Sequence, residues 1–337
     1  MRTAGPTAFS DEQLRSLVNL RQRYEVWIAA ERELASLPYD LRRKSVGKRD
    51  YLYEIADRTG NGRSLGQLTG ENERRLTDYR AAKKALKERR ASSAQALDES
   101  GRLVRALRLP LLASEAGAIL READRRDLLG THLMVVGTNA LPAYAIEAGG
   151  FLRDAPDETE DFDLAWTNPE PSDDERPIWS LLKAVDETYT VNTERAFQAR
   201  NRRAYEVEIL VAPSRAGGMF RTDQPRPVPL PEQEWLLKGK PIDHIVACRD
   251  ASPARIVAPD PRWFALQKLW LAAQTKRDPL KRRKDYRQGI AVLDAVAEAM
   301  PQYPLGSTFE SELPEELRPA FSDWRSTATS DRKPRWQ

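Results

Sequence analysis

The sequence predicts an α+β fold, with a small mixed β-sheet of α/β type as its core and helical regions before and after it. Short segments at 132–136 and 204–211 have the length and the apolar content of strands. Longer, heavily charged segments on both sides place apolar residues at helical spacing. Clusters of glycine and proline between these segments indicate the turns that connect them.

The same observations divide the chain into four parts. Residues 1–110 are expected to form an N-terminal helical region, residues 111–215 the core, residues 216–325 a loop followed by helices, and residues 326–337 a polar, disordered tail. A length of 337 residues allows one large domain or two ordinary ones.

The N-terminal region is expected to begin with a helix after Ser10, because Gln13 three residues later completes a capping box. Residues 39–70 are first basic and then rich in glycine, which indicates a loop around short helical pieces. A long charged helix follows from residue 71 to about 109, either continuous or broken near Gly101.

The core is expected to begin with the strand at 132–136, followed by a helix that Thr138 or Asn139 can cap. Residues 194–200 and 204–211 are expected to form a hairpin. Helices at 261–273 and 281–300 complete the predicted fold.

Three carboxylates in the core are arranged as in sites that bind divalent metal ions. Asp161 and Asp163 stand at i and i+2 of a strand, so their side chains share one face, about 7 Å apart. Glu208 lies in the strand 204–211, with Glu206 as an alternative on the same face. Carboxylates in this pattern can bind two divalent ions roughly 3.5–4 Å apart, an arrangement that suits phosphoryl and nucleotidyl transfer.

The order of these segments resembles the DNA-polymerase-β-like nucleotidyltransferase superfamily. The resemblance rests on the apolar strand, the Gly137-Thr138 turn, Asp161-Phe162-Asp163 and Val207-Glu208-Ile209. Gly-Thr replaces the usual Gly-Ser, and the spacer before Asp161 is longer than in minimal members.

Further segments resemble one bacterial branch of the superfamily, which has a long N-terminal helical region. They are Asp50-Tyr51-Leu52-Tyr53, residues 60–66, residues 261–269, Lys284-Asp285 and Gln288. Gln267 stands where that branch is expected to have histidine. The resemblance covers roughly residues 45 to 295.

The resemblance implies roles for individual residues. Asp161, Asp163 and Glu208 would be the catalytic and metal-binding residues, with Mg²⁺ or Mn²⁺ as the ion and an NTP such as ATP as the substrate. The residues expected to contact the nucleotide are Gly137, Thr138, Asn139, Lys268, Arg63 and Ser64.

Each of these residues also has a simpler interpretation. The two aspartates could belong to one solvated acidic loop together with Asp154, Asp157, Glu158 and Glu160. Gly137 could serve only a tight turn, and Lys268 could extend its ammonium group to solvent from an apolar helix. Lys284 and Asp285 fit an intrahelical or surface ion pair, and both His132 and His244 fit structural positions.

Composition excludes several classes of protein. The single cysteine, Cys248, rules out a disulfide framework and a cysteine zinc site. The N-terminus lacks a basic segment followed by an apolar one, and no apolar run approaches 18 residues, so we expect a cytoplasmic protein that neither carries a signal peptide nor spans a membrane. A net charge of +3 is only a weak indication of a polyanionic partner.

Two functions remain from the sequence. The first is transfer of a nucleoside monophosphate to a hydroxyl of an RNA 3′ end, a protein or a small molecule, with RNA or protein preferred because of the long N-terminal helices. By resemblance, such an enzyme could be a toxin or defence protein with a neutralising partner. The alternative is a non-catalytic protein of the same fold that binds nucleic acid or a partner.

Overall fold

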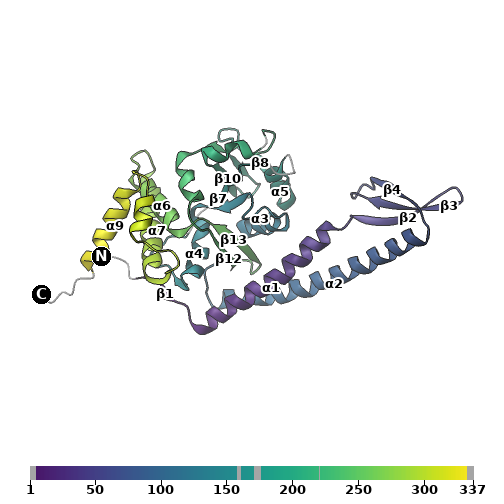
Figure 1. Cartoon of the computed structure of the whole chain (residues 1–337), viewed down its shortest axis with the longest axis horizontal. Helices are drawn as coiled ribbons and strands as arrows, with labels where there is room; N and C mark the ends of the chain where they lie inside the picture. The colour runs from purple at the N-terminus through teal and green to yellow at the C-terminus, as the bar shows by residue number, and fades with distance from the viewer. Residues whose placement is uncertain (1–4, 158–160, 171–175, 220, 332–337) are drawn as a thin grey trace. The chain divides into compact units, whose positions relative to one another are not determined.

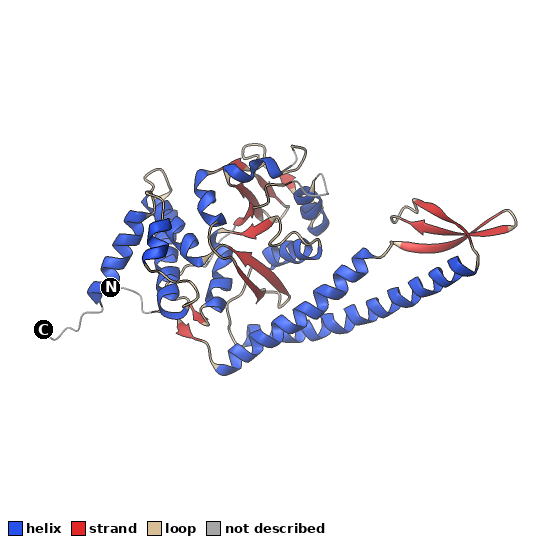
Figure 2. Ribbon diagram, viewed as in Figure 1, coloured by secondary structure: helices blue, strands red, loops and turns tan. Residues whose placement is uncertain are grey.

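The structure, a computed structural model, describes residues 5–157, 161–170, 176–219 and 221–331. It confirms the α+β class (Figures 1 and 2). Contacts divide the chain into two compact units. The larger unit comprises Met1–Val18 and Gly101–Gln337, and the smaller unit comprises Asn19–Ser100. The division into four parts made from the sequence remains a prediction.

A mixed six-stranded sheet lies in the larger unit. Its order is β5-β7-β10-β9-β8, and β11 also pairs with β10. The pairs β7–β10 and β10–β11 are parallel, while the other pairs are antiparallel. The strands are β5 Leu133–Val135, β7 Asp161–Trp166, β8 Thr190–Val191, β9 Gln198–Arg200, β10 Glu206–Val211 and β11 Val228–Pro229.

Helices and two short strand pairs surround this sheet (Figure 1). The helices are α3 Ser114–Arg125, α4 Leu141–Glu147, α5 Pro177–Val185, α6 Pro261–Ala273, α7 Pro279–Ala299, α8 Ser307–Glu312 and α9 Arg318–Asp331. The strand pairs are β12 Ile242–Ala247 with β13 Pro253–Ala258, and β1 Thr7–Ala8 with β6 Gly150–Phe151. The 3-10 turns are η1 Gly137–Ala140, η2 Pro213–Gly218 and η3 Pro231–Leu237.

Strands β7 and β10 explain where the core of the larger unit lies. Phe162 and Leu164 of β7, with Val207 and Ile209 of β10, are almost completely buried. Because strand side chains alternate between faces, these residues cover one face of the sheet and leave the acidic residues between them on the other. The alternating pattern of the sequence therefore fixes the face on which a site can form.

The smaller unit corrects one prediction. The segment expected to be a loop with short helical pieces is a three-stranded antiparallel sheet of β2 Asp40–Val46, β3 Arg49–Ile55 and β4 Gly62–Gln67. Most of β2 is charged and exposed, so it lacks the apolar alternation by which a strand is recognised. Only a small apolar cluster of Leu41, Leu52, Leu76 and Tyr79 joins the sheet to a helix.

The predicted N-terminal helices are confirmed. Helix α1 spans Asp11–Ser36, and Ser10 and Gln13 bond to each other's backbone N–H as a capping box requires. Helix α2 spans Gly70–Ala106 without a break at Gly101. A Cβ at Gly101 would lie 1.7 Å from the carbonyl oxygen of Ala251, so this glycine permits close packing and does not end the helix.

Helix α9 includes residues 326–331, the first part of the predicted tail, and residues 332–337 lie outside the described residues. Glu158 and Glu160 of the acidic-loop interpretation also lie outside them. Among the helices that the structure describes, none combines the length and the apolar character needed to cross a membrane.

Candidate active site

The two sequence-predicted aspartates open strand β7. Asp161 and Asp163 are partly buried, and the fully buried Phe162 stands between them on the opposite face. The aspartates therefore project from the same face of the sheet, as the i, i+2 spacing predicts.

Glu208 joins the aspartates through the parallel pairing of β7 with β10. Glu206 is in register with Asp161, and Glu208 with Asp163. Residues in register on neighbouring strands point to the same face, so four carboxylates share it. We call Asp161, Asp163, Glu206 and Glu208 the acidic cluster.

The two glutamates of the acidic cluster have different partners. Glu206 accepts hydrogen bonds from Arg200 Nε at 2.8 Å and from Gln198 Nε2 at 2.8 Å. Glu208 accepts one from the same Gln198 nitrogen at 3.0 Å. Arg200 neutralises Glu206, so Glu208 is the glutamate better suited to bind a cation.

The electrostatics of the acidic cluster favour a bound cation. Burial, and then the charges of Asp161 and Glu208, raise the pKa of Asp163 from its ordinary 3.8 to about 7, against the opposing effect of Lys268 and Lys281. Burial and the charge of Asp161 also raise the pKa of Glu208. Each negative charge here is costly because its neighbours are negative, and a divalent cation would remove that cost.

The glycine turn after β5 packs directly against the acidic cluster. Gly137 has φ +70°, and a Cβ there would lie 2.1 Å from Asp163 Oδ2. The backbone N–H of Val136 also donates to the Asp163 carbonyl at 3.1 Å. Glycine is thus required both by the backbone conformation and by the closeness of the carboxylate.

The residues after this glycine correct another prediction. Neither Thr138 nor Asn139 caps a helix with its side chain, because both lie within η1, before α4 begins. Asn139 Nδ2 donates to the Asp161 carbonyl at 3.0 Å, and Thr138 Oγ1 accepts from Gln288 Nε2 at 3.2 Å. These bonds join the turn to β7 and to α7.

Lys268, expected to reach nucleotide phosphates, lies in a buried ion pair. Its Nζ is 3.0 Å from Asp285 Oδ1, and only 5% of the residue is exposed. Arg277 binds the other oxygen of the same aspartate. The sequence also suggests an ion pair between Lys284 and Asp285. That interpretation is wrong for Asp285, which is buried and pairs with Lys268 and Arg277.

Helix α7 brings two other lysines to the acidic cluster. Lys281 Nζ lies 3.8 Å from Asp161 Oδ2, on a side chain that is 63% exposed. Burial and the charge of Lys268 lower the pKa of Lys284, while Asp161, Asp285 and Asp163 oppose this shift. Sequence reasoning missed Lys281 and also Gln198. The spacing of residues 281, 284 and 288 along one helix face could have indicated the first.

Arg63 and Ser64 lie on strand β4 of the smaller unit rather than in a loop. Arg63 pairs with Glu54 at 3.3 Å, and Ser64 Oγ accepts from the Gly66 N–H at 3.2 Å. Their contact with a nucleotide remains a prediction.

The carboxylates of the acidic cluster have the ligand chemistry of a magnesium site in which a substrate supplies the other ligands. Among the described residues, no three acidic, histidine or cysteine side chains are placed so that together they could hold a metal ion. Mg²⁺ does not need three such side chains, because it is often held by one or two carboxylates together with waters and substrate phosphates. Asp161, Asp163 and Glu208 supply the hard oxygen ligands that this mode requires.

Comparison with known protein families finds a match to the larger unit. A family model described as "Nucleotidyltransferase" matches residues 114–314, which is more than half of the chain. The match includes β5, η1, β7, β10, α6 and α7, and so every element of the site described above. No curated protein and no solved structure matches the chain.

Proposed function

Since the chain belongs to this nucleotidyltransferase family, we propose that it transfers a nucleoside monophosphate from an NTP to a hydroxyl group, and that it does so with divalent metal ions. One observation carries the proposal. The parallel register of β7 and β10 sets Glu208 beside Asp163 and on the same face as Asp161. That face meets the glycine turn at Gly137.

Asp161, Asp163 and Glu208 are the residues that would hold Mg²⁺ or Mn²⁺. Bound there, the ions would offset the charge of the triphosphate and make the acceptor hydroxyl easier to deprotonate. Gly137 leaves room for the substrate to approach the backbone closely, and Lys281 and Lys284 supply positive charge at the edge of the acidic cluster.

The proposed reaction is a single displacement at phosphorus. The acceptor oxygen forms a bond to the α-phosphorus, and the bond from that phosphorus to the β-phosphate oxygen breaks, so pyrophosphate leaves. The hydroxyl proton passes to Glu208, because burial and the charge of Asp161 raise the pKa of this carboxyl and make it a stronger base than an exposed glutamate. Positioning and charge neutralisation supply most of the rate enhancement in such reactions.

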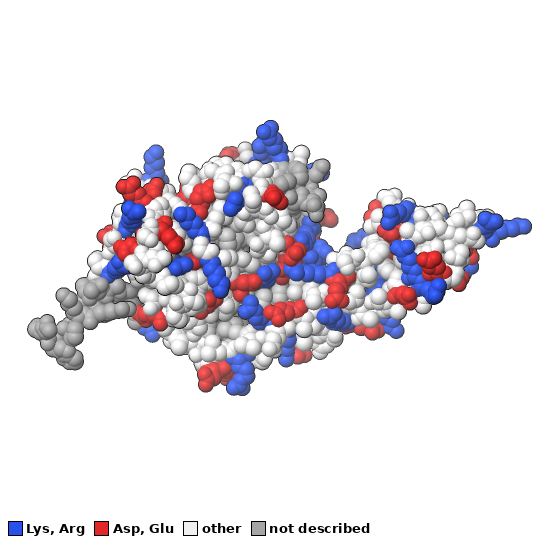
Figure 3. Space-filling model, in the orientation of Figure 1, with Lys and Arg blue, Asp and Glu red and all other residues white. Residues whose placement is uncertain are grey.

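The charge distribution supports RNA as the acceptor over a small molecule. Residues 19–100 contain 18 lysines and arginines against 13 acidic residues, a net charge of +5, although the whole chain has only +3. The rest of the chain therefore carries −2. Figure 3 shows basic and acidic side chains interspersed over the visible face. A protein acceptor, or a toxin role with a neutralising partner, belongs to the same proposal by resemblance.

Incubation with each α-labelled NTP, Mg²⁺, total RNA and total protein tests this proposal. We expect label from one NTP to remain on one macromolecular fraction. Asp161→Asn and Asp163→Asn should each lower the transfer rate by about 100-fold or more, because each removes a charged ligand. Glu206→Gln is the matched control, since it removes an acid of the same cluster that Arg200 neutralises.

Two results would count against the proposal. Folded wild-type protein that transfers label from none of the four NTPs would leave the non-catalytic alternative. Transfer that survives in Asp163→Asn at the rate of Glu206→Gln would show that another part of the chain carries the chemistry.

A further inference from the structure

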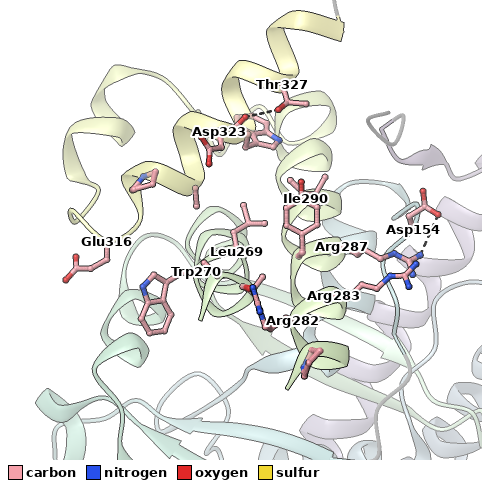
Figure 4. Close-up of a pocket in the computed structure, with 17 residues that line it drawn as sticks. Asp154, Leu269, Trp270, Arg282, Arg283, Arg287, Ile290, Glu316, Asp323 and Thr327 are labelled. Atoms are coloured by element: carbon pink, nitrogen blue, oxygen red, sulfur yellow. Dashed lines mark hydrogen bonds and ion pairs between the residues drawn. The ribbon is translucent and has the colours of Figure 1, made fainter. Parts of the chain in front are cut away.

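A large cavity lies between α6, α7 and α9, away from the acidic cluster (Figure 4). Its volume is about 1020 Å³, at the upper end of the range for small-molecule sites. Leu269, Ile290 and Trp324 give it apolar walls. The cavity has room for several planar groups.

Three arginines, together with Asp154, line one side of the cavity (Figure 4). They are Arg282, Arg283 and Arg287 of α7. Arg282 donates to the Ala272 carbonyl at 2.8 Å, and Arg287 lies 3.8 Å from Asp154. Arg283 is exposed, and no carboxylate of the described residues forms an ion pair with it. The planar set of donors on an exposed guanidinium matches a phosphate.

Two aromatic residues, Trp270 and Tyr286, line the same cavity. Trp270 packs edge-on against Trp235, with ring centroids 5.1 Å apart and planes at 85°, so its orientation is fixed. Tyr286 of α7 is 57% exposed although it is a large aromatic residue. Aromatic faces beside positive charge are typical of surfaces that stack the bases of single-stranded nucleic acid.

The opposite wall carries acids. Glu316 and Asp323, the second on α9, line the cavity across from the arginines of α7 (Figure 4). Carboxylates repel phosphates but accept hydrogen bonds from the amino groups of bases. This arrangement orients a bound strand, with phosphates along α7 and base edges toward α9. A purely acidic peptide would place some of its charges against the acidic wall and has no bases to stack.

Helix α7 connects this cavity to the acidic cluster. Pro279 in its first turn lines the cavity, and Lys281 two residues later approaches Asp161. Residues 283 and 287 lie on one side of the helix, while 281, 284 and 288 lie on another. The cavity and the acidic cluster therefore lie on different sides of the first half of α7.

We propose that this cavity binds single-stranded RNA, as the segment that leads to the acceptor hydroxyl. The inference rests on the proposed function and assigns the place where its RNA acceptor binds. It requires binding that is independent of catalysis, because the cavity contains none of the residues assigned to the metal ions.

Fluorescence anisotropy of a labelled single-stranded RNA 12-mer, titrated with the full chain in low salt, tests this inference without any transfer reaction. Arg283→Glu should weaken binding by about tenfold or more and reduce the salt dependence of log K by about 1 or more. Tyr286→Ala should weaken it by about tenfold through lost stacking.

Each variant has a matched control. Arg249→Glu makes the same charge change on the exposed turn between β12 and β13, and Leu280→Ala truncates a side chain on α7 that is 81% exposed and outside the cavity. Both should bind as wild type does. Asp163→Asn should lose transfer and still bind RNA in this assay, so failure of the proposed chemistry and failure of this inference are distinguishable.

Any of these results would overturn the inference: no RNA binding by wild type, equal weakening by Arg283→Glu and Arg249→Glu, or unchanged binding in Tyr286→Ala. Competition by a polyglutamate peptide that is as effective per charge as the RNA would also overturn it, because that peptide offers charge without bases.

Discussion

At the scale of single residues, a comparison of two glycines distinguishes the effect of a strained backbone from the effect of contact with the site. Gly137 and Gly149 both have positive φ, +70° and +62°. A Cβ at Gly137 would lie 2.1 Å from Asp163 Oδ2, whereas a Cβ at Gly149 meets no heavy atom within 4 Å. The two positions therefore share the conformational requirement and differ only in what stands beside them.

We predict that Gly137→Ala lowers transfer by about 100-fold, because Asp163 must move by about 1 Å to relieve the contact. Gly149→Ala should keep the rate within about twofold, although both variants should lose about 1–3 kcal/mol of stability from the strained backbone. Melting curves and initial rates of label transfer check this. Equal rates for the two variants would mean that the turn does not position Asp163.

At the residue scale, the sequence predicts those features of the site that depend on the spacing of residues within one strand. The i, i+2 aspartates and the apolar residues between them determine which side chains share a face. The sequence does not indicate that β10 pairs in parallel with β7, or that the register sets Glu208 against Asp163. The sequence also does not indicate that Arg200 pairs with Glu206, since that contact depends on the neighbouring strand β9.

At the scale of elements, the packing of α6 against α7 decides the role of Lys268. A Cβ at Gly289 of α7 would lie 2.7 Å from Leu269 of α6, so the helices approach closely. Lys268 and Asp285 face each other in this contact and are both buried. From the sequence, Lys268 is expected to bind phosphate. The spacing of residues within one helix does not show which side chain of the next helix lies opposite.

We predict that Asp285→Asn costs about 3–5 kcal/mol, because it leaves the buried Lys268 ammonium without its carboxylate. Lys268→Met should cost less, since its apolar chain still fills the space and Arg277 still pairs with Asp285. Urea denaturation of both variants measures these losses. A Lys268→Met variant with wild-type stability and a raised KM for the NTP would instead identify Lys268 as a direct phosphate ligand.

The sheet of the smaller unit shows where element prediction fails. Strand β2 has the sequence Asp-Leu-Arg-Arg-Lys-Ser-Val, and only Leu41 of it is buried. Both neighbours along the chain are turn-forming, so composition indicates a loop. Pairing with β3 over seven residues stabilises the strand instead, and backbone pairing leaves no periodic pattern in an exposed sequence.

At the scale of the whole molecule, the free energy of unfolding should depend on the ionisation of Asp163. This carboxyl has a pKa of about 7 in the folded chain, against an ordinary value of 3.8. Between these two pH values the folded state keeps a proton that the unfolded state has released. Stability from this group is therefore complete below pH 3.8 and is lost as the pH rises toward 7.

Other groups act in the opposite direction, so a difference between variants isolates the effect. Bonds from His244 lower the pKa of Glu147, and bonds from Arg125 and Arg126 outweigh burial and lower the pKa of Glu122, so both carboxyls add stability as the pH rises through acid values. Asp163→Asn removes the titration at residue 163 and leaves these two groups unchanged. The difference in unfolding free energy between this variant and wild type therefore reports on Asp163 together with the charges coupled to it, Asp161, Glu208 and Lys284.

We predict that, without metal, the unfolding free energy of Asp163→Asn increases relative to that of wild type as the pH rises from 5 to 7. The increase should be at most about 1.4 kcal/mol per pH unit and should stop above pH 7. Mn²⁺ at pH 8 should then stabilise wild type and not the variant, because a cation binds the deprotonated carboxylate. Thermal melting in matched buffers with and without Mn²⁺ measures both effects. A difference that is constant across this pH range would show that the acidic cluster does not hold a proton in the folded chain, and equal stabilisation of both proteins by Mn²⁺ would place the ion elsewhere.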